Sequence, residues 1–261
     1  MRSGHTTRLA VVRGKVYAFA NQKGGVGKTT TAVNLAACLA EAGERAVVVD
    51  LDPQANATSG LGLRANGTST YDLLDGAALQ DLAKPTQFEN LFLVPSRPEL
   101  AGAAVELARR DDGDRFLAEA LGRAEGFDFV LLDCPPSLGP LTVNALAAAH
   151  RVVVPVQTEY YALEGLAQLI QSIELVKRRI NPGLAIAGVL LTMADARTRL
   201  SADVEAEVRR HFGDLVFDAV VPRSIRVAEA PSHGLPVTHY DRRSRGAEAY
   251  WKVAMELVQR S

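Results

Sequence analysis

Cysteine is scarce in this chain of 261 residues, which contains only Cys38 and Cys134. Their spacing fits neither a disulfide framework nor a Cys-x-x-Cys metal or redox motif. Cys38 lies in an almost uniformly apolar segment, so we expect it to be a small buried hydrophobic residue. The cysteines therefore give no support to a fold that depends on disulfides or structural zinc.

Long apolar runs are also missing, because no run approaches the ~18 residues that span a bilayer. Residues 1–15 contain Arg2, Arg8, Arg13 and Lys15 but no apolar core of signal-peptide length. We interpret residues 1–15 as a loose basic leader and residues 16–261 as a single domain. The expected location is the cytoplasm.

Excess charge of either sign is absent too, since the formal net charge is −1. Any binding of nucleic acid would therefore need a local cluster of Lys and Arg. The composition, 48% hydrophobic and 23% charged, is ordinary for a globular protein and argues against disorder.

Continuous apolar runs, separated by segments of helical length, are what the sequence has instead. They cover residues 16–20, 46–49, 129–132, 152–156 and 186–191. Runs of this kind are typical of parallel strands that are buried on both faces. The pattern predicts an α/β fold with one doubly wound, mostly parallel sheet and helices on both faces.

A glycine-rich stretch, Asn-Gln-Lys-Gly-Gly-Val-Gly-Lys-Thr-Thr at residues 21–30, follows the first predicted strand and leads into a predicted helix at residues 29–42. Glycines let the main chain pass close to an anion, and the start of a helix adds positive potential. In such a loop Lys28 would neutralise the β- and γ-phosphates, and Thr29 would bind Mg²⁺. The first glycine of the general phosphate-loop template falls at Gln22, and Lys23 opens the loop instead. The flanking strand and helix make a chance glycine-rich turn the weaker interpretation.

Carboxylates follow two other predicted strands. Asp50 and Asp52 leave the second run, and Asp133 ends the run at residues 129–132 in a Walker B pattern. Either Asp50 or Asp52 could hold a magnesium-bound water or orient the attacking water. Asp133 would accept a hydrogen bond from a water molecule that is bound to Mg²⁺. Because ligands bind beyond the carboxyl ends of parallel strands, these segments are expected to meet at one site.

Residues 23–30 resemble the deviant Walker A motif of the ParA/MinD ATPases, and Asn21-Gln22 before them is most similar to the ParA (Soj) partitioning branch. The similarity runs from about residue 16 to residue 259. It implies a P-loop ATPase that uses ATP and Mg²⁺ and forms a homodimer with ATP, with Lys23 reaching the partner's nucleotide. The implied ATP-binding residues are Lys23, Gly24, Gly25, Val26, Gly27, Lys28, Thr29, Thr30, Pro222 and Arg223.

The resemblance also assigns roles to the carboxylates and to two arginines. It implies that Asp52 positions or activates the water and that Asp50 supports a metal site formed with Thr29 and Asp133. Arg197 and Arg226 are the closest matches to a surface that binds double-stranded DNA without sequence preference. The alternative without a DNA-binding role is that these are ordinary solvated surface arginines beside acidic residues. A ParB-type partner would stimulate hydrolysis and release the protein from the nucleoid.

Two rival functions fit parts of the sequence. A MinD-like ATPase would cycle on membranes through a basic amphipathic C-terminal helix, but Glu248 and Glu256 interrupt the positive charge of residues 245–260. An electron carrier resembling the nitrogenase iron protein would need two cysteines per subunit that share a cluster across a dimer. Membrane attachment is therefore the weaker expectation, and the cysteines do not favour the electron carrier.

Overall fold

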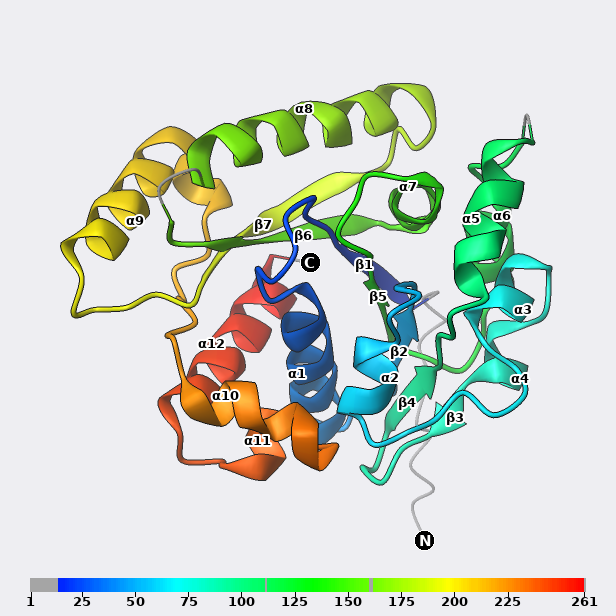
Figure 1. Cartoon of the computed structure of the whole chain (residues 1–261), viewed down its shortest axis with the longest axis horizontal. Coiled ribbons are helices and arrows are strands. Elements are labelled where there is room, and N and C mark those ends of the chain that lie inside the picture. The colour runs from blue at the N-terminus through cyan, green and yellow to red at the C-terminus, as the bar shows by residue number, and fades with distance from the viewer. Residues whose placement is uncertain (1–13, 111, 160–161, 261) are drawn as a thin grey trace, which may run out of the picture.

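A computed structural model of the chain describes residues 14–110, 112–159 and 162–260. Residues 1–13 of the expected leader lie outside this part, and the first strand begins at Lys15. The described residues form a seven-stranded sheet in the order β3-β4-β2-β5-β1-β6-β7 (Figure 1). The strands are β1 (Lys15–Phe19), β2 (Ala46–Asp50), β3 (Lys84–Pro85), β4 (Leu91–Val94), β5 (Phe129–Asp133), β6 (Arg151–Gln157) and β7 (Ala185–Thr192).

Parallel pairing runs through this sheet except at its edge, where β3 pairs with β4 in the antiparallel sense. Strands β1, β2 and β5 are buried almost throughout, as their continuous apolar runs predict. The predicted doubly wound α/β fold is confirmed.

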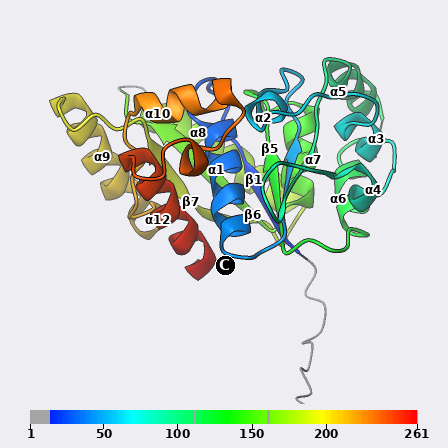
Figure 2. The same ribbon diagram turned by 90° about the horizontal axis from the view of Figure 1, so that it is seen from below.

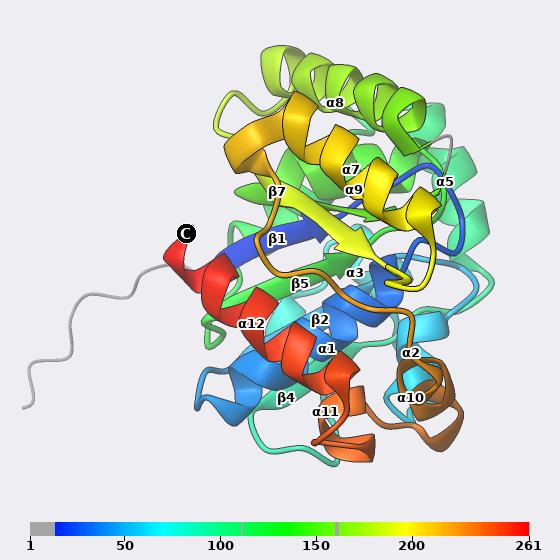
Figure 3. The same ribbon diagram turned by 90° about the vertical axis from the view of Figure 1, so that its left-hand side faces the viewer.

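Helices cover both faces of the sheet, and alternate strand residues feed two apolar cores. Val16 and Ala18 pack with one core, whereas Tyr17 and Phe19 pack with the other. Figure 3 shows the β7 edge with α8 and α9 on one face and α1 and α12 on the other. The first face carries α3 (Thr70–Leu74), α5 (Leu100–Ala108), α6 (Phe116–Leu121), α7 (Pro140–Ala148), α8 (Ala162–Arg179) and α9 (Arg199–Phe212). The second carries α1 (Lys28–Glu41), α2 (Asn56–Gly60), α11 (Val237–Tyr240) and α12 (Arg245–Gln259).

Four short elements complete the described chain: α4 (Leu79–Leu82), α10 (Ile225–Glu229) and two 3₁₀ turns at Gly213–Leu215 and Ala230–His233. Figure 2 shows α2 and α10 at the end of the sheet from which α1 starts. The apolar stripe at residues 163–176 packs into the core, as its helical spacing predicts.

Strand register decides where the functional side chains meet. Asp133 of β5 is the register partner of Asp50 on one side and of Phe19, the last residue of β1, on the other. The glycine-rich loop leaves β1 at this level. Three segments that are far apart in the sequence therefore converge at the carboxyl ends of adjacent strands.

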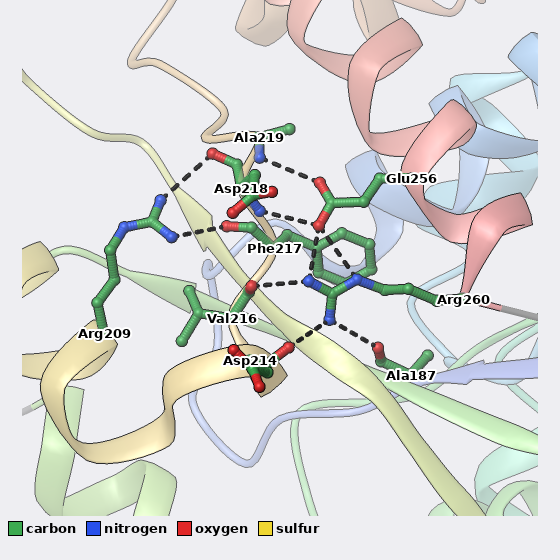
Figure 4. A network of polar contacts seen from close by, with 9 residues as sticks. All are labelled: Ala187, Arg209, Asp214, Val216, Phe217, Asp218, Ala219, Glu256 and Arg260. Carbon is green, nitrogen blue, oxygen red and sulfur yellow. Dashed lines mark hydrogen bonds and ion pairs between the residues drawn. The ribbon is translucent and has the colours of Figure 1, made fainter.

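The C-terminal helix fixes the chain that follows β7 (Figure 4). Glu256 accepts hydrogen bonds from the main-chain N–H groups of Asp218 and Ala219, at 2.9 and 3.1 Å. Arg260 donates to the carbonyls of Asp214 and Val216, at 2.9 and 2.8 Å. Because charged groups hold this main chain at several points, the segment that continues to Pro222 has a defined path.

Candidate active site

The glycine-rich loop adopts the conformation that its glycines permit. Gly25 and Gly27 have φ values of 76° and 87°, in the left-handed region that other residues rarely adopt. Helix α1 begins directly after Gly27, its N-cap residue, and no side chain caps the start of the helix with a hydrogen bond. The first N–H groups of α1 are therefore available to an anion.

Side chains anchor this loop to the neighbouring strands. The Asn21 amide donates to the carbonyl of Pro155 in β6 at 2.7 Å, and its oxygen accepts from the N–H of Lys23 at 3.0 Å. The Thr192 hydroxyl at the end of β7 donates to the carbonyl of Val26 at 2.9 Å. The side chain of Asn21 therefore links the start of the glycine-rich loop to β6.

Lys28 is buried, with 6% of its surface exposed, and its Nζ donates to the carbonyl of Lys23 at 3.2 Å. Burial lowers the pKa of Lys28, while the charges of Asp133 and Asp52 oppose that shift. The ammonium forms no ion pair with a carboxylate of the described residues. A phosphate placed beside it would supply the missing counter-charge.

A cavity of about 460 Å³ opens over this loop, a size suited to a small-molecule ligand. It brings together six of the predicted loop residues, Gly24, Gly25, Gly27, Lys28, Thr29 and Thr30, with Asp52. Val26 is buried and does not line it. The other lining residues are Val33, Asn34, Gln54, Asn56, Ser59, Gly60, Pro136, Met193, Pro231 and Leu235.

Asp50, the last residue of β2, and Asp52 have different surroundings, which the sequence could not separate. Asp52 lines the cavity, and its Oδ1 accepts from the N–H of Gln54 at 3.0 Å. Asp50 is fully buried behind it, where Oδ2 accepts from the N–H and hydroxyl of Thr58 at 2.9 and 2.7 Å. Oδ1 of Asp50 accepts from the N–H of Asp52 at 3.1 Å. Burial raises the pKa of Asp50 to about 6, and the bonds from Thr58 oppose the shift.

Asp133 is fully buried, and neither of its oxygens meets the geometry of a hydrogen bond with the described residues. Burial raises its pKa well above the usual value, and nearby Asp50 adds to the rise. The Thr29 hydroxyl is close enough to offset part of this shift. An orphaned buried carboxylate beside a hydroxyl is the chemistry that a magnesium ion and its waters would satisfy.

Mg²⁺ suits this place better than a metal that needs an all-protein cage. Among the described residues no group of three His, Cys, Asp or Glu side chains is arranged to hold a metal. Mg²⁺ is usually held by one or two carboxylates together with substrate phosphates and water. Thr29 and Asp133 therefore fit the ion as ligands or partners of its waters, whereas Asp50, the register partner of Asp133, already accepts hydrogen bonds from Thr58 and Asp52.

Lys23 points to a different place from Lys28. It is not among the residues that line the cavity, its side chain is 53% exposed, and its Nζ lies 2.5 Å from Oε2 of Glu159. Glu159 is itself 47% exposed, so water screens this ion pair. The side chain is thus on the surface of its own subunit, where contact with a second subunit stays a prediction.

Pro222 and Arg223, predicted to border the nucleotide, do not line this cavity. Main-chain bonds explain their position: the N–H of Arg223 donates to the carbonyl of Ala194 at 2.9 Å, and Val221 donates to Leu191 of β7. The turn therefore runs beside the end of β7. It borders a second hollow of about 420 Å³, which we call the arginine hollow.

The arginine hollow brings together the two arginines predicted to bind DNA. Its lining is Ala194, Asp195, Ala196, Arg197, Pro222, Arg223, Ile225, Arg226 and Arg245. Arg197 forms a two-point ion pair with Asp195, at 2.9 and 2.7 Å. Arg226 lies 3.2 Å from Glu229 and 3.4 Å from Asp241. The predicted pair is thus assembled, and both members already have carboxylate partners.

Three further residues that line the cavity over the glycine-rich loop, Met193, Pro231 and Leu235, carry no sequence motif. Asn34 of α1 contacts the segment that carries Pro231 and Leu235, because its Oδ1 accepts from the N–H of Val237 at 2.7 Å. No motif marks these apolar loop residues, which follow the glycine-rich stretch by more than 160 positions. Only the path of the chain brings them to the site.

The cysteines and the helices bear on the rival functions. Cys38 is buried in α1, as predicted, and Cys134 is buried beside Asp133, where burial raises the pKa of its thiol. Neither thiol is exposed for a cluster shared between subunits. In the part of the chain that the structure describes, no helix is both long and apolar enough to cross a bilayer.

Known proteins share this sequence and architecture. An AAA domain family matches residues 14–186. The chain is 54% identical to the chromosome-partitioning ATPase Soj of Thermus thermophilus, over 96% of this chain and 98% of the relative. It is 52% identical to the sporulation initiation inhibitor protein Soj of Bacillus subtilis, over 94% and 98%.

A solved structure supports the same assignment. The cobyrinic acid a,c-diamide synthase from Mycobacterium smegmatis, crystallised with an ATP analogue and magnesium, has a TM-score of 0.82 and 38% identity. The match covers 94% of this chain and 95% of that one. Since the curated relatives match at higher identity over nearly their whole length, the chain belongs to the Soj/ParA family of chromosome-partitioning ATPases.

Proposed function

We propose that this chain is a DNA-partitioning ATPase in which ATP binding creates a DNA-binding dimer and hydrolysis dissolves it. The chain is a magnesium-dependent ATPase, and the reaction is ATP + H₂O → ADP + phosphate. One observation supports the chemistry above all others: Lys28 and Asp52 face one cavity, while the orphaned carboxylate of Asp133 lies buried beside them.

Each residue has a role that follows from its surroundings. The loop N–H groups and Lys28 would bind the β- and γ-phosphates, and Asp52 would orient the attacking water. Thr29 and Asp133 would hold Mg²⁺ through direct or water-mediated contacts, and the ion would neutralise charge on the phosphates. Asp50 would position Asp52, since its carboxylate accepts the N–H of that residue.

The dimer would depend on Lys23. Its surface position and its weak, half-exposed pair with Glu159 support a lysine that exchanges partners when a second subunit carrying ATP approaches. Two subunits would then complete each other's sites. A nucleotide-dependent dimer acts as a switch, because hydrolysis removes the γ-phosphate that the partner's lysine contacts.

DNA binding would follow from dimerisation. The arginine hollow of each subunit supplies local positive charge to a chain with almost no net charge. Two such surfaces on one duplex would bind more tightly than one, and binding would weaken steeply with salt. A ParB-type partner would stimulate hydrolysis and release the protein from the nucleoid.

Binding to long double-stranded DNA of arbitrary sequence, measured with ATP and with ADP, tests this proposal. We expect tight, salt-sensitive binding with ATP alone, prolonged by Asp52→Ala, which holds the ATP state. Lys23→Ala should abolish ATP-dependent dimerisation in light scattering. Binding to anionic vesicles with no binding to DNA would replace this function with a membrane-cycling one.

A further inference from the structure

Asn34 is a buried polar residue of α1, with 3% of its surface exposed. Its amide donates to the carbonyl of Thr30, one turn earlier, at 2.7 Å, and its Oδ1 accepts from the N–H of Val237 at 2.7 Å. Val237 is the first residue of α11, and the first N–H groups of a helix have no partner within the helix. Asn34 therefore supplies the acceptor for a segment that lies 203 residues later in the chain.

This hydrogen bond bears on the cavity over the glycine-rich loop because of the residues that precede Val237. Leu235 lines the cavity, together with Pro231. Only Pro236 separates Leu235 from Val237, and the ring of a proline fixes its φ, which is −63° here. The bond to Asn34 therefore determines how closely Leu235 approaches the cavity.

The other side of this segment contacts α2, which also lines the cavity. Gly234 has a φ of 68°, and a Cβ atom there would lie 2.8 Å from the Cα of Gly62, just after α2. The two main chains are thus in close contact. Loss of the bond from Asn34 would free one side of residues 231–237 while α2 still supports the other side. We expect the segment to loosen and the fold to persist.

We propose that Asn34 is a positioning residue for nucleotide binding, because it holds Leu235 against the cavity before ATP enters. A surface that is already in place binds a ligand without the entropy loss of ordering that surface. The inference rests on the proposed nucleotide site around Lys28. In it Leu235 makes the contact with the nucleotide, and Asn34 acts through Leu235.

Titration of the full chain with a fluorescent ATP analogue and Mg²⁺ tests this inference. Asn34→Ala should weaken binding about 10-fold, because the analogue must then order a segment that the hydrogen bond held in place. The KM for ATP should rise by a similar factor. Turnover at saturating ATP should stay within about twofold, since Lys28 and Asp52 keep their surroundings.

Asn144 provides a matched control, because it has the same kind of hydrogen bonds outside the cavity. It is buried in α7, where its amide donates to the carbonyl of Pro140, one turn earlier, at 3.0 Å and to the carbonyl of Gly113 at 2.7 Å. Its Oδ1 accepts from the N–H of Leu117 at 3.2 Å. Asn144→Ala should lower the urea midpoint as Asn34→Ala does, yet leave the affinity for the analogue within about twofold. An equal loss of affinity in both variants would assign the effect to general destabilisation and overturn the inference.

A double-mutant comparison shows whether Asn34 acts through Leu235. Leu235→Ala should weaken binding of the analogue by itself, and Leu235→Ala combined with Asn34→Ala should bind no more weakly than Asn34→Ala alone. Additive losses, or a Leu235→Ala variant that binds normally, would overturn the inference. If Lys28→Ala binds the analogue as well as the unaltered chain does, the nucleotide lies elsewhere and the proposed site itself is wrong.

Discussion

Thr58 holds the buried Asp50 in place, and its hydroxyl takes part in two buried hydrogen bonds. It donates to Oδ2 of Asp50 at 2.7 Å and accepts from the N–H of Ser96 at 2.9 Å. Thr58→Val removes both bonds with little change in shape, whereas Thr58→Ser keeps the hydroxyl. Comparison of Thr58→Val with the unaltered chain therefore isolates the hydroxyl, and Thr58→Ser reports the loss of the methyl group alone.

The size of the effect follows from these contacts. A hydrogen bond to a charged group contributes about 1.5–3 kcal/mol, and an unsatisfied buried N–H costs about 1–3 kcal/mol. Thr58→Val should therefore be about 3–5 kcal/mol less stable than the unaltered chain, whereas Thr58→Ser should lose only about 1 kcal/mol with its methyl group. Asp50 keeps two main-chain bonds, from Thr58 and from Asp52, in both variants.

Urea unfolding followed by circular dichroism at pH 8 measures this difference. At that pH Asp50 is ionised, since its pKa is about 6. Equal m-values in the two variants would show that the free energies of unfolding are comparable. A difference between the variants below about 1 kcal/mol would contradict the assignment of this buried contact.

Three further predictions concern packing, pH and the surface ion pair. Gly188→Ala places a Cβ atom 2.6 Å from a ring carbon of Phe217 and should cost about 1–3 kcal/mol in urea unfolding. Gly102→Ala, in an open helical position, should be neutral or stabilising, and equal effects would refute this account. Burial lowers the pKa of His150, so the unfolded chain binds a proton that the folded chain does not, and stability should fall as pH drops below about 6.5. His150→Gln should flatten that dependence, and an unchanged pH profile would assign it to other groups. Glu159→Gln removes an exposed pair worth about 0–1 kcal/mol, so ATP-dependent dimerisation should tighten by at most about fivefold; abolished dimerisation would show a larger role for Glu159.

The fold was predictable because its determinants are local. Continuous apolar runs identified strands β1, β2, β5, β6 and β7 to within one or two residues at each end. Gly43, which directly follows the helix predicted at residues 29–42, has a φ of 95°, a conformation that favours glycine after a helix. The short edge strand β3 has only two residues and a proline, so it left no periodic pattern to read.

Sequence motifs predicted part of the site, namely the residues that belong to a motif, and did not predict the other residues that line the cavity. The phosphate loop and the carboxylates that end β2 and β5 follow from strand order, since the carboxyl ends of parallel strands share one edge of the sheet. Met193, Pro231 and Leu235 belong to no motif. Arg223 lines the arginine hollow, and its contact with the base stays a prediction.

The sequence by itself determined the strands, the glycine-rich loop and the kinds of charged group that such a loop needs, because these depend on residue type and spacing along the chain. Tertiary structure alone decided that Asp52 faces the cavity while Asp50 is buried behind it. It also decided which arginines are paired with carboxylates. Exposure and ion pairing depend on segments far apart in the sequence, and a chain read one residue at a time does not show which of them meet.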